Sequence, residues 1–407
     1  MVETLVYKRN LYIDRIRPFV GKPVVKVITG MRRVGKSCLL RLMIDGLADR
    51  GKNGKGILYI NKESLDWNFI QNHNDLNAYV KAAFSDVKGE KYLFVDEIQE
   101  IDGWEKAVAS FLSGGGIDIY IAGSNANLLS SEIATLISGR YIEIPVYGLS
   151  FGEFVFFRKQ SGQNYKEEFS TYLWAGGFPA IHHFDLNREI VYQYVSSIYD
   201  TILLKDVIKG NNIRNVSLLE NITHYIFDNI GNIFTAKKVS DYLKSRRIRV
   251  GAETVQNYIS YLVSTFSVFK VPRFDVRGKR LLELHEKYYL GDVALRHALL
   301  GYREGDISGI LENIVFLELK RRGYRVFLGK AGNREIDFIA EKENRKIYIQ
   351  VAYLLTSPET VEREFSVLHS VKDNYPKYVI SMDEIFGTDV HGIKRINLVD
   401  FLLDTEI

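Results

Sequence analysis

The segment from Gly30 to Ser37 has the residue types and the spacing of a phosphate-binding loop. It reads Gly-Met-Arg-Arg-Val-Gly-Lys-Ser and fits the pattern Gly-x4-Gly-Lys-Ser/Thr without a gap. In such a loop the glycines let backbone N–H groups curl around phosphate oxygens, the lysine reaches the β- and γ-phosphates, and the serine hydroxyl ligates Mg²⁺. The segment follows an apolar stretch at residues 24–29 and precedes a helical pattern, which is the required context. We therefore expect nucleotide binding by Gly30, Arg32, Arg33, Val34, Gly35, Lys36, Ser37 and Cys38.

A second motif, from Tyr92 to Glu97, is an apolar run that ends in two carboxylates. Phosphoryl transfer needs a metal ion that neutralises charge and a group that positions the attacking water. We expect Asp96 to hold Mg²⁺ together with Ser37, and Glu97 to orient or deprotonate the water. An acidic pair that only favours the start of a helix is the alternative. The phosphate loop upstream favours the catalytic interpretation.

Two further polar residues are placed where they could act on the same phosphates. Asn125 follows the apolar run at residues 118–122, and a polar side chain at a strand tip can reach the γ-phosphate or the water; its alternative is a turn residue. Arg140 precedes the next apolar run and could stabilise transition-state charge on its own chain or on a neighbouring subunit. Its alternative is a surface arginine. The candidate catalytic residues are thus Glu97, Asn125 and Arg140.

The nucleobase is expected to be adenine. Guanine recognition usually needs an Asn-Lys-x-Asp element late in the sheet, whereas the segment from Asn61 to Ser64 follows the second expected strand and lacks the final Asp. The expected cofactors are therefore ATP and Mg²⁺.

The elements that must position these residues alternate regularly through the first 150 residues. Strand-like apolar runs alternate with amphipathic segments, as in a mostly parallel five-stranded sheet covered by helices, which is an α/β fold. We expect strands at 24–29, 57–61, 92–95, 118–122 and 141–144, and helices at 36–47, 75–84 and 104–112. The alternation of strands and helices stops between Gly148 and Tyr165, where we place a domain boundary.

The remaining chain predicts three further segments. A helical pattern is followed by two helices at 235–247 and 252–265 and by strands at 268–273 and 281–284, which is the order of a winged helix. A helix at 311–322 then precedes strands at 325–328, 336–340 and 346–352, which form a smaller α/β unit. The predicted domains are 1–155, a P-loop ATPase domain; 156–230, a helical linker or lid; 231–305, winged-helix-like; and 306–407, nuclease-like.

Positive charge is concentrated in the winged-helix-like segment. Between Lys244 and Arg280 there are nine basic and two acidic residues, a local charge of +7 compared with +4 for the whole chain. Nucleic-acid phosphates are one explanation, and a solvated face or a surface that docks another domain or protein is the other. The candidate nucleic-acid contacts are Arg246, Arg247, Arg249, Arg277, Lys279 and Arg280.

The last segment looks like the PD-(D/E)xK nuclease core, in which acidic residues bind Mg²⁺ and a lysine assists. Glu312, Asp337 and Gln350 match the metal-ligand positions, but Ala352 stands where the lysine belongs. Lys330 is a conceivable substitute from a neighbouring loop. We expect a vestigial site in a fold that is retained for binding, and an active nuclease is the alternative.

In their order and spacing these motifs resemble the AAA-type P-loop ATPases, and specifically a bacterial and archaeal family that joins such a module to a C-terminal domain of unknown function. The resemblance implies a central phosphate-loop strand flanked by the strands at 118–122 and 141–144, and an ATP-driven conformational switch. It is carried by residues 29–37, 94–99, 123–125, 136–140, 149–154, 287–292 and 334–353.

Composition excludes several other classes. Hydrophobic residues at 46% and charged residues at 26% are typical of a packed globular protein. The longest charge-free runs have 16 residues and contain polar, Gly or Pro residues, so no membrane crossing is expected. The N-terminus does not read as a signal peptide, and the single Cys38 excludes an internal disulfide. We therefore expect a cytoplasmic protein.

One functional hypothesis follows from these expectations. The chain is a Mg²⁺-dependent ATP-binding protein and ATPase whose nucleotide cycle switches a C-terminal module that acts on nucleic acid or a protein partner. The alternatives are an ATP-dependent nuclease and a slow signalling or regulatory NTPase switch with a protein partner. An oligomer is compatible with the sequence.

Overall fold

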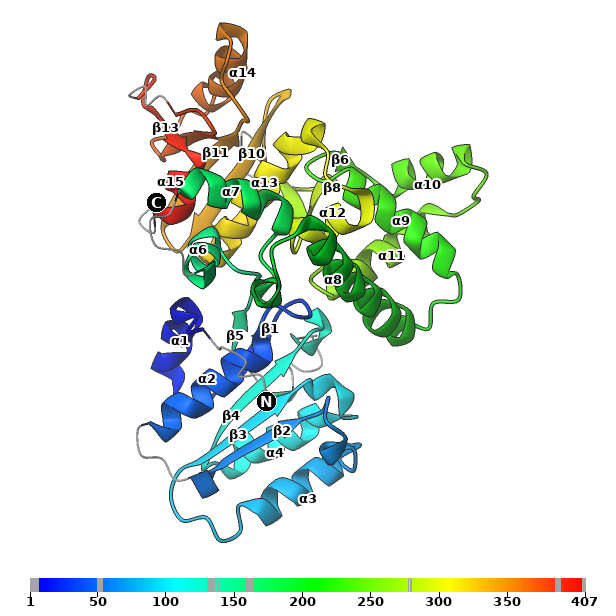
Figure 1. The fold of residues 1–407 in the computed structure, drawn as a ribbon, viewed down its shortest axis with the longest axis vertical. Helices are drawn as coiled ribbons and strands as arrows, with labels where there is room; N and C mark the ends of the chain where they lie inside the picture. Colours follow the sequence, from blue (N-terminus) through cyan, green and yellow to red (C-terminus); the bar gives the residue numbers. More distant parts are fainter. Residues whose placement is uncertain are drawn as a thin grey trace. The chain divides into compact units, whose positions relative to one another are not determined.

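The computed structural model describes residues 7–49, 54–129, 136–137, 139–158, 164–276, 278, 280–384 and 389–404. The chain divides into two compact units, one of Met1–Val146 with Ser264–Phe266, the other of Tyr147–Val263 with Ser267–Ile407 (Figure 1). Among the described residues, no helix combines the length and the apolar character that a bilayer crossing requires.

The first unit is built on a five-stranded sheet in which all strands run parallel, which confirms the predicted fold class. Its strands are β1 (Val25–Thr29), β2 (Ile57–Asn61), β3 (Lys91–Asp96), β4 (Ile117–Gly123) and β5 (Tyr141–Pro145). The order is β2-β3-β4-β1-β5, so β1 is flanked by β4 and β5 as expected. The middle strand is β4, however, and β1 lies one position from the edge.

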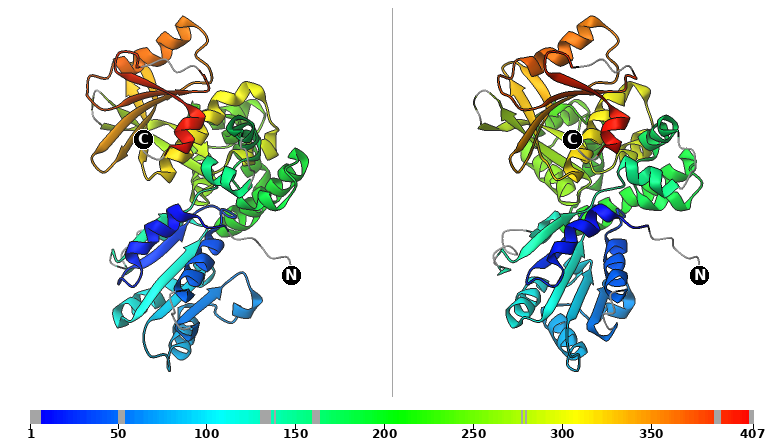
Figure 2. Two further views of the ribbon diagram at one scale, coloured as in Figure 1. Left: turned by 60° about the vertical axis from the view of Figure 1, so that its left-hand side comes forward. Right: turned by 90° about the vertical axis from the view of Figure 1, so that its left-hand side faces the viewer.

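Helices cover both faces of this sheet (Figure 2). They are α1 (Asn10–Ile16), α2 (Lys36–Ala48), α3 (His73–Ala83) and α4 (Trp104–Gly114), with short 3₁₀ turns η1 (Arg17–Phe19), η2 (Gly54–Gly56), η3 (Leu65–Trp67), η4 (Ile98–Glu100) and η5 (Ala126–Leu129). Val25 and Val27 of β1 pack in one core with residues of α3 and α4. Since all five residues of β1 are buried, both faces of this strand are covered, as expected for a parallel sheet.

The second unit contains most of the helices. They are α6 (Phe151–Arg158), α7 (Tyr165–Ala175), α8 (Arg188–Thr201), α9 (Val216–Asp228), α10 (Ala236–Ser245), α11 (Ala252–Ser264), α12 (Val293–Leu300), α13 (Ile307–Arg321), α14 (Pro358–His369) and α15 (Leu398–Leu403). The turns η6 (Pro179–His183) and η8 (Glu304–Asp306) are 3₁₀ helices, and η7 (Ile202–Lys209) continues α8 as a π-helix.

An eight-stranded sheet runs through the second unit in the order β13-β12-β11-β10-β9-β7-β8-β6. Its strands are β6 (Ile233–Phe234), β7 (Val268–Asp275), β8 (Arg280–Leu290), β9 (Arg325–Ala331), β10 (Arg334–Lys342), β11 (Arg345–Val351), β12 (Lys377–Ser381) and β13 (Ile393–Asn397). The hairpin of β7 and β8 follows α10 and α11 in the predicted order, and β7 pairs in parallel with β9. One sheet therefore crosses the predicted boundary at residue 305, and the four-domain division stays a prediction.

Candidate nucleotide-binding site

The phosphate loop connects the end of β1 to the start of α2, both within the first unit. The backbone carbonyl of Thr29 accepts a hydrogen bond from Val146 N–H at 2.7 Å, and the Thr29 hydroxyl donates to Glu143 at 2.7 Å. Gly30 follows with a φ of 145°, and a Cβ at this position would collide with the carbonyl oxygen of Val146. Only glycine therefore lets the chain turn out of the sheet here.

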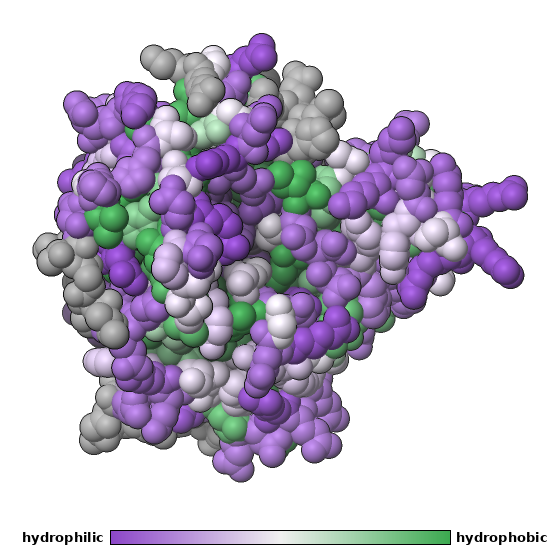
Figure 3. Space-filling view, turned by 90° about the horizontal axis from the view of Figure 1, so that it is seen from above, coloured by the Kyte–Doolittle hydropathy of each residue, from purple (hydrophilic) through white to green (hydrophobic). Residues whose placement is uncertain are grey.

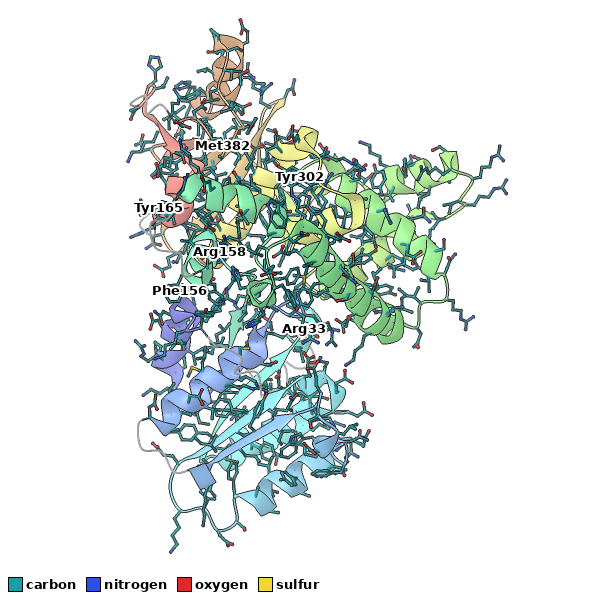
Figure 4. All side chains as sticks on the ribbon, viewed as in Figure 1. Arg33, Phe156, Arg158, Tyr165, Tyr302 and Met382 are labelled. Atoms are coloured by element: carbon teal, nitrogen blue, oxygen red, sulfur yellow. The ribbon has the colours of Figure 1, made fainter. Side chains whose placement is uncertain are left out.

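Lys36 lies at the first position of α2 and is 4% exposed. Its Nζ donates to the backbone carbonyls of Gly30 at 2.9 Å and Met31 at 3.0 Å. The ammonium is thus folded back over the start of the loop, held by two neutral acceptors. Arg33, labelled in Figure 4, is exposed on the same loop and has a φ of 64°.

A residue that the sequence reasoning missed also contacts the loop. Arg9, directly before α1, donates from Nη1 to the carbonyl of Val34 at 2.9 Å and is 5% exposed. Its guanidinium lies 4.6 Å from the ring centroid of Tyr12. No motif marks an arginine that lies more than twenty residues before the loop, so only the fold reveals this contact.

Asp96 ends β3 and is 1% exposed. Its Oδ2 accepts the Tyr59 hydroxyl at 3.2 Å and its Oδ1 accepts the Glu97 N–H at 3.1 Å. Burial raises the pKa of Asp96, while hydrogen bonding from the Ser37 hydroxyl and the charge of Lys36 oppose the rise. The structure therefore brings Ser37 and Asp96 together, as the proposed metal site requires.

Glu97 adopts a left-handed backbone conformation, with φ 51° and ψ 49°, and is 5% exposed. Its Oε2 accepts hydrogen bonds from the Gln99 amide and, at 3.2 Å, from the Ser124 hydroxyl. Ser124 thus contacts the predicted catalytic carboxylate. Asn125 lies at the tip of β4, where its backbone carbonyl accepts the Leu128 N–H at 3.2 Å.

The Gln99 side chain fits closely against β4. A Cβ on Gly123 would clash with the Gln99 Oε1 and with Leu128, so the strand has no side chain at the point where the amide approaches. The Oε1 atom is buried and has no hydrogen-bond partner within the part of the chain that the structure describes. Gln99 lies two residues after Glu97 in the sequence, but the periodicity of the sequence does not predict that the Gln99 side chain folds back onto the Glu97 carboxylate.

Arg140 lies away from the phosphate loop of its own chain. Its carbonyl accepts the Val25 N–H at 2.9 Å at the amino end of β1, whereas the loop follows Thr29 at the carboxyl end. The strand between these points spans roughly 13 Å at about 3.3 Å per residue. The geometry disfavours action on the phosphates bound by the same chain.

A Mg²⁺ site of the P-loop kind fits these residues. Such a site uses a loop hydroxyl, an acidic residue, phosphate oxygens and water rather than a cluster of acids, and Ser37 and Asp96 provide the first two. No group of three or more His, Cys, Asp or Glu side chains that could hold a metal is found among the described residues.

The predicted nuclease-like residues meet in the second unit. Glu312 of α13, Asp337 of β10 and Gln350 of β11 line one cavity of about 460 Å³. The Gln350 Oε1 accepts the Asp337 N–H at 3.3 Å. The lysine next to them is Lys287 of β8 instead of Lys330, because β8 extends six residues beyond the predicted strand and carries Lys287 into the site.

The predicted nucleic-acid contacts are only partly described. Arg246, Arg247 and Arg249 are exposed between α10 and α11, and Arg280 is exposed at the start of β8. Figure 3 shows this side of the second unit as a hydrophilic projection. Arg277 and Lys279 lie outside the described residues.

The fold and the loop geometry define an AAA-type P-loop ATPase domain followed by a helical and sheet-containing C-terminal part. Residues 22–155 match the family described as an AAA domain, and residues 166–306 match a domain of unknown function (DUF8612). Among solved structures, the Walker-type ATPase paby2304 of Pyrococcus abyssi is similar, with a TM-score of 0.54 and 14% identity over 73% of this chain and 97% of that chain.

Two relatives identify the family. An uncharacterized protein of Haemophilus influenzae is 36% identical over 405 residues, which is 99% of this chain and 100% of that protein. The uncharacterized protein MJ1544 of Methanocaldococcus jannaschii is 33% identical over 371 residues, covering 86% of this chain and 79% of that protein. The chain belongs to this family of P-loop ATPases with a C-terminal domain of unknown function.

Proposed function

We propose that this protein is a Mg²⁺-dependent ATPase whose nucleotide cycle switches a C-terminal module that acts on nucleic acid. The supporting observation is the group of polar side chains at the carboxyl edge of the first sheet. Lys36 and Ser37 follow β1, and Asp96 and Glu97 lie at the end of β3, the two strands that flank β4. This group suits a triphosphate, a metal ion and a water molecule.

Each residue has a defined task in this proposal. ATP phosphates replace the carbonyls of Gly30 and Met31 as partners of the Lys36 ammonium, because an anion attracts it more strongly than a neutral acceptor. Ser37 and Asp96 hold Mg²⁺, which neutralises charge on the phosphate oxygens. Glu97 orients the attacking water and accepts its proton, while Gln99 and Ser124 hold the carboxylate.

Two substitutions test the site. Lys36→Ala removes the cation at the β/γ-phosphates and should abolish ATP binding in equilibrium titration. Glu97→Gln keeps the shape but loses the base, and it should bind ATP while hydrolysis falls by about 10² or more. Gln71→Ala, an exposed change two residues before α3, serves as the control. Normal turnover in Glu97→Gln would refute the assignment of the catalytic carboxylate.

Arg140 is proposed to act on ATP bound by a neighbouring subunit, since its own loop lies at the opposite edge of the sheet. Mixing Arg140→Ala with Lys36→Ala then restores part of the activity, because each variant supplies what the other lacks. A mixture as inactive as its components speaks against this role.

The C-terminal module is proposed to contact nucleic-acid phosphates through the exposed arginines between α10 and α11. ATP turnover is measured with and without single- and double-stranded DNA. Stimulation supports the proposal. Turnover that is slow and indifferent to DNA favours a signalling switch with a protein partner.

A further inference from the structure

Three carboxylates in the second unit surround a single ammonium. The Nζ of Lys287 on β8 lies 2.6 Å from Glu335 Oε1, 3.2 Å from Glu312 Oε2 and 3.5 Å from Asp337 Oδ1. Lys287 is 5% exposed and Asp337 is 6% exposed. The carboxylates come from α13 and β10, so the ammonium links three elements that are distant in the sequence.

The same carboxylate oxygens have additional partners. Glu312 Oε2 also accepts the Tyr289 hydroxyl at 2.9 Å, and Asp337 Oδ2 accepts the Val351 N–H at 2.9 Å. Glu312 and Asp337 are the residues that a nuclease core would use to bind Mg²⁺. In this chain the oxygens of Glu312 and Asp337 already accept hydrogen bonds from donors of the protein itself.

The arrangement pairs one ammonium with several acidic side chains. The Lys287 Nζ lies within 3.5 Å of a carboxylate oxygen from each of Glu312, Glu335 and Asp337. A Mg²⁺ ion at Glu312 and Asp337 would need contacts of about 2.0–2.1 Å to oxygens that already face this positive charge. Repulsion between the two cations in a buried site opposes metal binding.

We propose that Lys287 is a built-in counter-ion that takes the place of a divalent metal in this site. The residues present therefore do not fit the metal ion that the resemblance to nuclease cores implies. The ammonium instead fastens β8 to α13 and β10. This site of the C-terminal module is then independent of divalent metal ions.

The test measures Mn²⁺ binding to the full chain without nucleotide, by calorimetry and by the electron paramagnetic resonance of Mn²⁺. All proteins carry Asp96→Asn, which removes the carboxylate that we assign to the metal ion of the nucleotide site. The otherwise native chain, the control Lys330→Ala and the charge-preserving Lys287→Arg should bind no Mn²⁺ at this site. Lys287→Ala leaves three carboxylates without their cation and should gain Mn²⁺ binding, which a further Asp337→Asn removes.

Two results would overturn the proposal. One is Mn²⁺ binding by the chain with native Lys287 that Asp337→Asn abolishes. The other is a Lys287→Ala chain with a native circular dichroism spectrum that gains no Mn²⁺ binding. If Lys287→Ala does not fold, the titrations of the native site and of Asp337→Asn decide the question. None of these results depends on ATP hydrolysis, so failure here is distinguishable from failure of the proposed ATPase function.

Discussion

Glu97 has a backbone conformation that residues with a side chain rarely adopt. Its φ of 51° places it in the left-handed region, which costs about 1–2 kcal/mol for a residue other than glycine. The Gln99 amide and the Ser124 hydroxyl hold its carboxylate at the end of this turn. The strain is thus located at the residue that we propose as the catalytic base, and its neighbours fix where that base points.

Gln99→Ala tests this positioning role. The substitution removes one donor to Glu97 but touches no residue of the phosphate loop, so kcat should fall by about 10²-fold while KM for ATP stays unchanged. Steady-state kinetics of the variant and of the exposed control Gln71→Ala measure the difference. A raised KM with native kcat would show that Gln99 serves binding instead of the chemical step.

Tyr59→Phe tests the electrostatics of Asp96. Burial raises the pKa of Asp96, and the Tyr59 hydroxyl is one of the groups that lower it. Without this donor the pKa rises further, so the carboxylate becomes protonated at a higher pH and Mg²⁺-dependent ATP binding is lost at a higher pH. The control is Tyr92→Phe, because the Tyr92 hydroxyl of the native chain donates to Glu90. Superimposable pH profiles for Tyr59→Phe and the native chain would contradict this account.

At the residue scale the sequence predicts the loop and the acidic pair, because each consists of neighbouring residues in a fixed spacing. It does not predict the contacts of Arg9, Ser124, Gln99 or Lys287. Some of these contacts join residues that are far apart in the sequence and meet only in the folded protein. The others depend on the direction in which a side chain points, and the periodicity of apolar residues does not predict that direction. The sequence offers Lys330 as a conceivable substitute for the missing lysine, whereas Lys287 is the lysine that contacts Asp337.

At the scale of elements, Asp292 joins two segments of the second unit. It is the N-cap of α12, where its Oδ1 accepts the Ala294 N–H at 2.9 Å, and its Oδ2 accepts the Gly177 N–H at 2.8 Å. Burial raises the pKa of Asp292 to about 6 although both hydrogen bonds oppose the rise. The start of α12 is therefore fastened to the chain that follows α7.

Asp292→Ala should destabilise the protein most at low pH. A carboxyl whose pKa is raised on folding stabilises the protein fully below its unfolded pKa, and this contribution is lost as the pH rises through about 6. The destabilisation should thus grow by roughly 3 kcal/mol as the pH falls from about 7 to about 4. Denaturant unfolding at several pH values measures it. Thr235→Ala, at the uncharged N-cap of α10, should cost about 1 kcal/mol at every pH. If Asp292→Ala also lowers the free energy of unfolding by the same amount at every pH, the proposed role of the raised Asp292 pKa is refuted.

Most of the expected helices and strands are present, but β8 is longer than the sequence predicts. The alternation of residues 281–284 predicts a short strand, whereas β8 continues to Leu290. The pairing with β7 shifts register between Val271 and Arg273, so that Val271 faces Lys287 while Arg273 faces Leu282. An irregularity of this kind interrupts the alternation that sequence patterns rely on. The longer strand explains why the Lys287 site could not be anticipated.

At the scale of the whole molecule, the sequence predicts which segments are present more readily than how they combine. The first unit follows from alternating strands and helices that are neighbours in the chain. In the second unit, β7 pairs with β9 across more than fifty residues, and this pairing merges the predicted winged-helix-like and nuclease-like segments into one sheet. Such a pairing depends on long-range packing, which a local pattern does not record.

The exposed arginines between α10 and α11 carry the prediction for nucleic acid. Arg246, Arg247 and Arg249 lie together in a short turn, and the Arg246 guanidinium lies 5.4 Å from the Tyr242 ring centroid. If all three contact phosphates, their replacement by Gln removes three contacts that release counterions. The slope of log affinity against log salt should then shrink by about 2.7, from about 0.9 for each contact on duplex DNA.

The matched control is a triple Gln variant of Arg345, Lys372 and Lys394. These residues are also exposed, and they lie in β11, between α14 and β12, and in β13. Both variants lose the same charge, so a general electrostatic effect would weaken their DNA binding alike, whereas a specific surface affects only the first. Fluorescence anisotropy at several salt concentrations measures both slopes, and ATP turnover without DNA should be native in each. If this surface docks a protein and not DNA, replacing Arg246, Arg247 and Arg249 leaves the slope of log affinity against log salt unchanged. That result would remove nucleic acid from the proposed function of this module.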